Sequence, residues 1–344
     1  GETVRARRAL RTRISLAATG LLALASVTST SATAVSVPPL TPTLLASQIS
    51  GASRSNSVGT IQPTLTEVLS KPPWAFVGLD RLEVGCNPRL ATWIVDNPIP
   101  CNFGPTNGAT TVVLVGASHA GMWLPALIAM ANQDKFQLKS FIYAGCPPVT
   151  MDFSTGLIKF EGLVVSAASC HTWNDNVVGA INALHPDVIL VGGGTEAASS
   201  VPATFAAYAT GMSEFVQQLT APKKVILGST TMRTAGQETA RCVNSHLTTV
   251  TACNTPYNGA NPSDPTMLLL RRDQQVAKTA NARLAPLISL TCTPSTKAKP
   301  MALCPPVVNH KLVYTDRSHL SSAYVTYVTP VFRSLVNSAL TPSS

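Results

Sequence analysis

Short apolar runs alternate with longer segments of helical spacing over most of the chain. The predicted strands are 110–115, 137–144, 186–192 and 223–229, and a last strand or strand-like segment is predicted at 310–316. The predicted helices are 119–133, 166–184, 203–220, 264–288 and 321–340, and Asp264 and Pro265 supply a cap and a first-turn residue for the fourth. Strands that alternate with helices predict an α/β domain, in which helices cover both faces of a mostly parallel sheet.

The segment before these elements has a different composition. Residues 37–79 are rich in Ser, Thr and Pro and show no clear hydrophobic period. We therefore predict a linker there, with one short helix near 64–70. The domain itself is predicted over 80–344, and it begins with a cysteine-bounded, loop-rich stretch that continues to about residue 110.

Residues 1–36 combine a basic run with an apolar run. Residues 1–13 hold five arginines, and an apolar stretch follows from about residue 14 to residue 35. One interpretation is a secretory signal with the small residues Ala32-Thr33-Ala34 at its cleavage site. The other is a transmembrane helix, because the stretch is close to the roughly 20 residues that span a bilayer, with the arginines on the cytoplasmic side. Both interpretations place the remaining chain outside the cytoplasm.

Cysteine usage agrees with export. An even number of cysteines in an exported chain indicates disulfides, and no pair has the C-x-x-C spacing of a zinc site. The simplest pairing joins neighbours along the sequence, although spacing alone leaves other pairings open. The eight cysteines, in that order of pairs, are Cys86 and Cys101, Cys146 and Cys170, Cys242 and Cys253, and Cys292 and Cys304.

Composition narrows the function classes. Hydrophobic residues make up 45% of the chain and charged residues 12%, so the chain can bury a large core. The net charge is +9, but the basic N-terminal run supplies much of it, and no cluster of Lys and Arg is interleaved with aromatic residues. We therefore expect no nucleic-acid partner.

Ser118 lies where the first predicted strand meets a helix. A serine there is more often a helix cap than a nucleophile, and a hydroxyl needs a base to become nucleophilic. Asp316 ends the last predicted strand-like segment, and His319 follows it three residues later. Functional residues gather at the carboxyl ends of parallel strands, so these three residues form a candidate catalytic triad. In it, His319 takes the proton of Ser118 and Asp316 orients the imidazole.

The other histidines show no comparable pattern. His119 adjoins Ser118, and we expect it to leave in another direction and to pack or bind locally. No carboxylate partner stands in a useful pattern near the remaining four, and no metal constellation is evident. We expect neither a metal nor another cofactor. The remaining histidines are His171, His185, His246 and His310.

The blocks "LVGASHAGMWLPAL" and "DRSHL" resemble the first and last blocks of SGNH hydrolase-like domains. The resemblance is closest to the extracytoplasmic SGNH domain at the C-terminus of membrane acyltransferase-3 family proteins, and it covers roughly 80–340. Further matching positions are Gly85-Cys86, Cys101 to Gly104, Cys146-Pro147, Cys170 and Trp173. The resemblance implies a three-layer α/β/α fold with a flavodoxin-like sheet. It also implies that Gly1 marks a boundary downstream of a many-helix membrane domain.

Two positions depart from the family pattern. Ala117 replaces the usual Asp before the serine, and "VGGGTEAA" lacks the usual Asn that donates to the oxyanion. Backbone N–H groups can do the same work. We therefore expect the oxyanion hole at the N–H groups of Ser118 and Gly145, with Gly193 or Gly194 as a third donor.

The resemblance implies three functional hypotheses. The first is an O-acyltransferase at the cell membrane that moves an acyl group, from a donor supplied by the membrane domain, to an envelope glycan outside the cytoplasm. The second is a carbohydrate or lipid esterase with the same triad and water as acceptor. The third is a non-catalytic envelope binding module, which the two departures motivate.

Overall fold

The computed structural model describes residues 38–151, 165–194, 202–231 and 238–341. The compact unit formed by these residues begins at Pro39. Both interpretations of the basic and apolar N-terminal run concern residues outside the described part of the chain. Within the described part, no helix is both long enough and apolar enough to cross a membrane.

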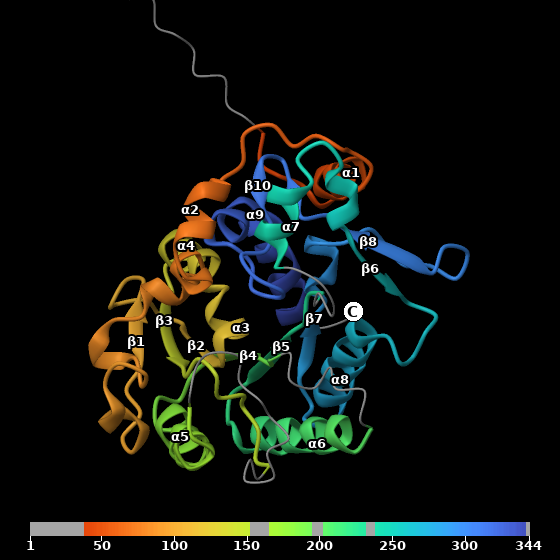
Figure 1. The fold of residues 1–344 in the computed structure, drawn as a ribbon. Coiled ribbons are helices and arrows are strands. Elements are labelled where there is room, and N and C mark those ends of the chain that lie inside the picture. Colours follow the sequence, from red (N-terminus) through yellow and green to blue (C-terminus); the bar gives the residue numbers. More distant parts are fainter. Residues whose placement is uncertain (1–37, 152–164, 195–201, 232–237, 342–344) are drawn as a thin grey trace, which may run out of the picture. The chain divides into compact units, whose positions relative to one another are not determined.

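A six-stranded sheet forms the centre of this unit (Figure 1). Its order is β1-β3-β2-β4-β5-β7; the short edge strand β1 is antiparallel to β3, and the other neighbours are parallel. The five parallel strands have the order of flavodoxin-like sheets. The strands are β1 (Cys101–Phe103), β2 (Thr111–Gly116), β3 (Gln137–Ile142), β4 (Val188–Gly192), β5 (Lys223–Leu227) and β7 (Arg283–Ala285).

Helices cover both faces of the sheet, as predicted, and α5 and α6 lie on the side opposite α4 and α9 (Figure 1). Successive side chains along each strand point to opposite faces of the sheet. In β2, Val112 and Leu114 belong to the apolar cluster with α4 and α9, whereas Val113 and Val115 belong to the cluster with α5, α6 and α8. The helices are α4 (Leu124–Asp134), α5 (Ala167–Asn182), α6 (Pro202–Gln218), α8 (Pro265–Thr279) and α9 (Ser322–Leu340).

The predicted linker differs from the structure. Residues 42–52 form α1 (Pro42–Ala52), in which Leu45 and Ile49 are buried in the same cluster as α9. The predicted short helix is confirmed as α2 (Leu65–Ser70), with a capping box between Thr64 and Glu67. From residue 39 onward this segment therefore packs as part of the domain, because its few apolar side chains lie at helical spacing.

Two predictions near the C-terminal half are wrong. The predicted helix 264–288 ends as α8 at Thr279, because Asn281 has a positive φ of 49° and the next residues pair with β5 as strand β7. The predicted strand 310–316 is only β10 (Lys311–Leu312), which pairs with β9 (Val307–Val308) outside the central sheet. The loop that carries Asp316 and His319 therefore follows a small hairpin and not a strand of the main sheet.

The eight cysteines form the four disulfides that join neighbours along the sequence. Two of them hold irregular segments against regular ones: Cys86–Cys101 ties the lead-in to β1, and Cys146–Cys170 ties the segment after β3 to α5. The remaining short elements are α3 (Ser118–Gly121), α7 (Thr239–Ser245), β6 (Thr255–Asn258), β8 (Met301–Cys304) and 3₁₀ turns at 73–76, 78–81, 84–86, 92–95, 250–253 and 287–290.

Candidate active site

Ser118 is the first residue of α3, two residues beyond the end of β2. A glycine at 116 makes this turn possible. Its φ is +151°, and a Cβ there would lie 2.3 Å from the carbonyl oxygen of Gly192 on β4. Ala117 is buried and offers no side-chain cap to α3. Ser118 therefore stands at the carboxyl edge of the sheet between β2 and β4, where the strand order reverses and ligands bind in such sheets.

Asp316 and His319 reach this edge from the loop between β10 and α9. The Asp316 Oδ1 atom accepts the backbone N–H groups of Ser318 and His319, each at 2.8 Å. Its Oδ2 atom lies 2.7 Å from Nδ1 of His319, and Nε2 of His319 lies 2.7 Å from Oγ of Ser118. The structure thus brings the three predicted triad residues into one continuous hydrogen-bonded chain, although Ser118 and His319 are 201 residues apart in sequence.

The charge of Asp316 determines the direction of these hydrogen bonds. Burial alone would raise the pKa of its carboxyl group, but the charge of His319 and the hydrogen bonds from His319 and Ser318 outweigh burial and hold the pKa well below its usual range. An ionised carboxylate only accepts, so Nδ1 of His319 carries the proton. In the neutral ring, Nε2 then carries no proton and accepts from the hydroxyl group of Ser118. This is the protonation state that a general base requires.

The backbone of Asp316 is held by α7. The carbonyl oxygen of Asp316 accepts both the backbone N–H of Thr239, at 3.3 Å, and its hydroxyl, at 2.9 Å. The Cys242–Cys253 disulfide fixes the same short helix. The sequence carries no signal for this support, because Thr239 lies 77 residues from Asp316 along the chain.

The expected oxyanion donors differ in their availability. The N–H groups of Ser118 and Gly145 have no hydrogen-bond partner among the described residues, and Gly145 follows β3 with a positive φ of 88°. The N–H of Gly194, in contrast, donates to the hydroxyl of Tyr208 at 3.2 Å. The expectation for Gly194 as a donor is therefore corrected: its N–H is turned toward α6. Gly193 packs against the guanidinium of Arg272, 2.6 Å from where a Cβ would be.

His119 does not leave the site, contrary to our expectation. Its ring stacks on the ring of His319, with centroids 4.1 Å apart and an interplanar angle of 23°. Its Nε2 lies 2.9 Å from Oγ of Ser318. His119 therefore covers one face of the His319 ring, and Ser118 and Asp316 are hydrogen-bonded to the two ring nitrogens of His319. Sequence adjacency to Ser118 was the available signal, but it could not show the direction of the side chain.

A buried ion pair lies behind the ends of β4 and β5. Arg272 is 0% exposed and Asp273 1%, and Arg272 Nη2 lies 2.7 Å from Asp273 Oδ1. Arg272 also donates to the carbonyl of Gly194 and, at 2.9 Å, to the hydroxyl of Ser229. The pair thus connects two loops of the site. The signal was present in the sequence, because both residues share the apolar face of α8 with Leu269 and Val276.

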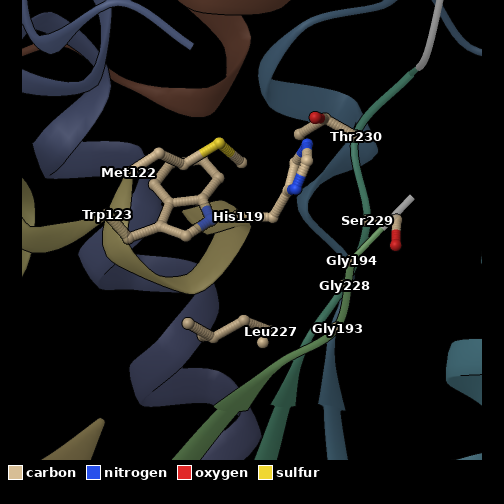
Figure 2. Close-up of a pocket in the computed structure, with 10 residues that line it drawn as sticks. His119, Met122, Trp123, Gly193, Gly194, Leu227, Gly228, Ser229 and Thr230 are labelled. Carbon is tan, nitrogen blue, oxygen red and sulfur yellow. The ribbon is translucent and has the colours of Figure 1, made fainter. Parts of the chain in front are cut away.

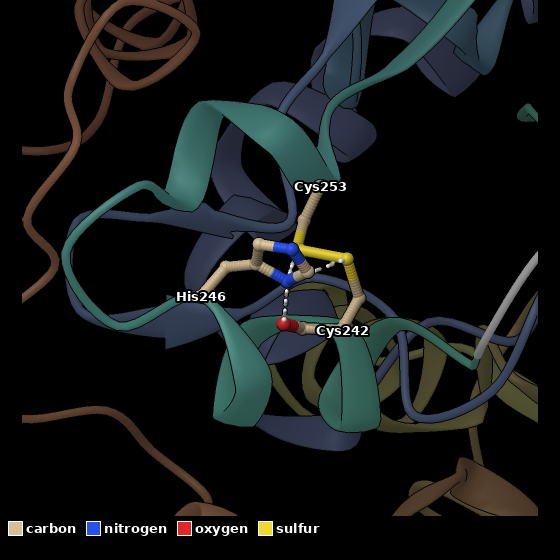
Figure 3. A group of neighbouring side chains, drawn as sticks. All are labelled: Cys242, His246 and Cys253. Atoms are coloured by element: carbon tan, nitrogen blue, oxygen red, sulfur yellow. Dashed lines mark hydrogen bonds between the residues drawn. A yellow bond between two sulfur atoms is a disulfide. The ribbon is translucent and has the colours of Figure 1, made fainter.

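A possible metal cluster lies in the segment around α7 (Figure 3). The Nδ1 atom of His246 is 3.8 Å from the sulfur atoms of both Cys242 and Cys253. These sulfurs are joined in a disulfide, and Nδ1 of His246 lies 2.8 Å from the carbonyl oxygen of Cys242. Zinc binds thiolates, so the oxidised pair does not provide zinc ligands.

The flavodoxin-like sheet, with a serine after its central strand and an Asp-x-x-His segment before the last helix, defines an SGNH hydrolase-like domain. The family model described as "SGNH domain (fused to AT3 domains)" matches residues 86–334, and the chain belongs to this family. A solved structure with similarity is the periplasmic domain of the lipopolysaccharide acetyltransferase of Salmonella ser. Paratyphi A. It has 14% sequence identity and a TM-score of 0.46, over 69% of this chain and 85% of that chain. No curated protein matches.

Proposed function

We propose that this chain is the extracytoplasmic part of a membrane-associated O-acyltransferase, which transfers an acyl group, most simply acetyl, to a cell-envelope glycan. The observation that carries the proposal is the chain of two 2.7 Å contacts from Ser118 through His319 to Asp316. Four disulfides suit an oxidising compartment. Fusion to AT3 domains, which the family description states, would supply the acyl donor from the membrane.

The proposed reaction has two balanced steps. In the first, the hydroxyl proton of Ser118 moves to Nε2 of His319 while Oγ attacks the donor's acyl carbonyl, and the donor leaves with that proton. In the second, the acceptor hydroxyl gives its proton to His319 and attacks the acyl-enzyme, and Oγ of Ser118 leaves and regains a proton. The N–H groups of Ser118 and Gly145, with that of Gly193 as a third donor, are proposed to stabilise the oxyanion in both steps.

Intact-mass spectrometry of the full chain exposed to 4-nitrophenyl acetate tests the first step. We expect a single acetyl adduct that Ser118→Ala abolishes. Ser70→Ala is the control, because Ser70 is exposed and bonds only within α2. A failure of the parent chain to form the adduct, and to turn over the ester across a range of pH, would contradict catalysis and favour the binding-module alternative.

The acceptor separates transfer from hydrolysis. The acyl-enzyme is common to the transferase and the esterase, so the two differ only in whether a sugar hydroxyl or water attacks it. With 4-nitrophenyl acetate as donor, a transferase forms acetylated methyl glycoside in addition to acetate. Release of acetate alone, at every glycoside concentration tested, would favour the esterase.

A further inference from the structure

Nδ1 of His119 is a buried polar atom with no hydrogen-bond partner among the described residues. Leaving a buried polar group unpaired is unfavourable, and each such group in a native fold calls for an explanation. The opposite nitrogen of the ring is occupied, because Nε2 lies 2.9 Å from Oγ of Ser318. The His119 ring is thus anchored on one side and unsatisfied on the other.

The ring lines a small cavity beside the triad (Figure 2). Figure 2 shows His119 between Trp123 of the segment after β2 and the strand ends that carry Gly193, Gly194 and Ser229. The cavity has a volume of about 10 Å³, which is close to the space of one water-sized group. Glycines at the ends of β4 and β5 are among the residues that line this space.

The surroundings favour an uncharged occupant. Burial lowers the pKa of His119 well below its usual value, the charges of His319 and Arg272 lower it further, and Asp316 only partly opposes them. His119 is therefore neutral at neutral pH. Arg272 directs its charge to Asp273, Gly194 and Ser229. The chemistry at the cavity is that of a neutral imidazole nitrogen.

A hydroxyl group fits Nδ1 in either tautomer of the neutral ring. The Ser318 hydroxyl can donate to Nε2 or accept from it, so Nδ1 either carries the proton or lacks it. A carbonyl or ether could only accept from Nδ1, and an ammonium could only donate to it. A hydroxyl does both.

We propose that Nδ1 of His119 binds a second hydroxyl of the acyl acceptor, next to the hydroxyl that attacks the acyl-enzyme. The attacking hydroxyl must reach Nε2 of His319, and the two imidazole rings are stacked 4.1 Å apart. We assign the two hydroxyls to one acceptor molecule, on neighbouring carbons. The acceptor class is a vicinal diol, as found in saccharides. This inference rests on the proposed acyl transfer through Ser118.

The test compares acceptors within each protein. With 4-nitrophenyl acetate as donor, acetyl transfer to 1,2-propanediol and to 1-propanol is measured in the same variant. The ratio of the two rates cancels any general damage to His319. We expect the parent chain to prefer the diol, and His119→Gln to lose roughly three- to tenfold of that preference, the effect of one neutral hydrogen bond. The glutamine amide keeps a polar atom near the Nε2 position but none at Nδ1.

His119→Asn is the matched control, since its amide places a polar atom near the Nδ1 position and abandons the Ser318 contact. It should keep most of the diol preference while its overall rate falls. A purely packing role for His119 predicts the opposite pattern: all variants lose rate and the ratio stays constant. An unchanged ratio in His119→Gln would overturn the proposal.

A binding measurement separates this inference from the proposed function. Ser118→Ala cannot be acylated, so the ¹⁵N shift of His119 Nδ1 in this variant reports binding alone. Titration with methyl β-glucopyranoside should move that shift, and titration with sodium acetate should not. A response to acetate only, or to neither probe, would overturn the inference whether or not the parent chain forms an acetyl adduct. In the latter case a water molecule, and not an acceptor, pairs with Nδ1.

Discussion

Replacing Asp316 by asparagine tests the protonation pattern of the site with almost no change in shape. The Oδ1 atom of Asp316 accepts two backbone N–H groups at 2.8 Å, and Oδ2 faces Nδ1 of His319 at 2.7 Å. An asparagine has one accepting oxygen and one donating NH₂ group. The two backbone donors select the oxygen for the Oδ1 position, so the NH₂ group faces Nδ1 of His319.

The variant therefore reverses the tautomer of His319. Nδ1 must accept from the amide, the proton of the neutral ring moves to Nε2, and Nε2 then donates to Ser118 and cannot take its proton. We expect the rate of Ser118 acetylation to fall by a factor on the order of 10³–10⁴, as for a wrong tautomer in other serine triads. This factor corresponds to roughly 4–5.5 kcal/mol in the activation barrier.

Stopped-flow release of 4-nitrophenolate, followed by intact-mass analysis, measures this rate. Asp134→Asn is the control, because Asp134 forms a partly exposed ion pair with Arg333, and such pairs contribute only about 0–1 kcal/mol. Its acetylation rate should equal that of the parent chain. Circular dichroism confirms that Asp316→Asn is folded. A folded Asp316→Asn that acetylates within tenfold of the parent rate would refute the tautomer argument and the role of Asp316.

Three further predictions concern the support of the site. Gly116→Ala should lower the free energy of unfolding by about 2–4 kcal/mol in urea titrations, since its Cβ meets backbone, whereas Gly51→Ala, with open space around it, should not destabilise the domain. Arg272→Met leaves the buried carboxylate of Asp273 without its ion-pair partner and should lower the free energy of unfolding by about 3–5 kcal/mol. Adding Asp273→Leu should restore most of this stability, and a double variant as unstable as Arg272→Met would refute the pairing argument. His119 has a lowered pKa, so below about pH 6.5 the unfolded chain binds a proton that the folded chain does not. The free energy of unfolding should therefore decrease as the pH is lowered, by at most about 1.4 kcal/mol per pH unit from this group. His119→Phe should make this decrease shallower between pH 7 and 5, and an identical slope in the variant would contradict the assigned pKa shift.

The central strands could be predicted from the sequence because they are buried on both faces. Such strands are continuous apolar runs, as in β2 and β4. β3, β4 and β5 lie within predicted segments, and β2 extends one residue beyond its predicted segment. The end of α8 could not be predicted, because the apolar pattern continues through Leu284 and Ala285 into β7. Pairing with β5, a contact between distant segments, decides that these residues form a strand.

The candidate site was likewise predicted in part from the sequence, and the tertiary structure decided the rest. The residue types of Ser118, Asp316 and His319, and their positions at the ends of predicted elements, could be read from the sequence. Tertiary structure decided which nitrogen of His319 faces Ser118 and that His119 stacks on the same ring. It also decided that Gly194 donates to Tyr208 instead of facing the site. Local patterns report how a segment is buried, whereas hydrogen-bond direction depends on neighbours that the fold brings from far along the chain.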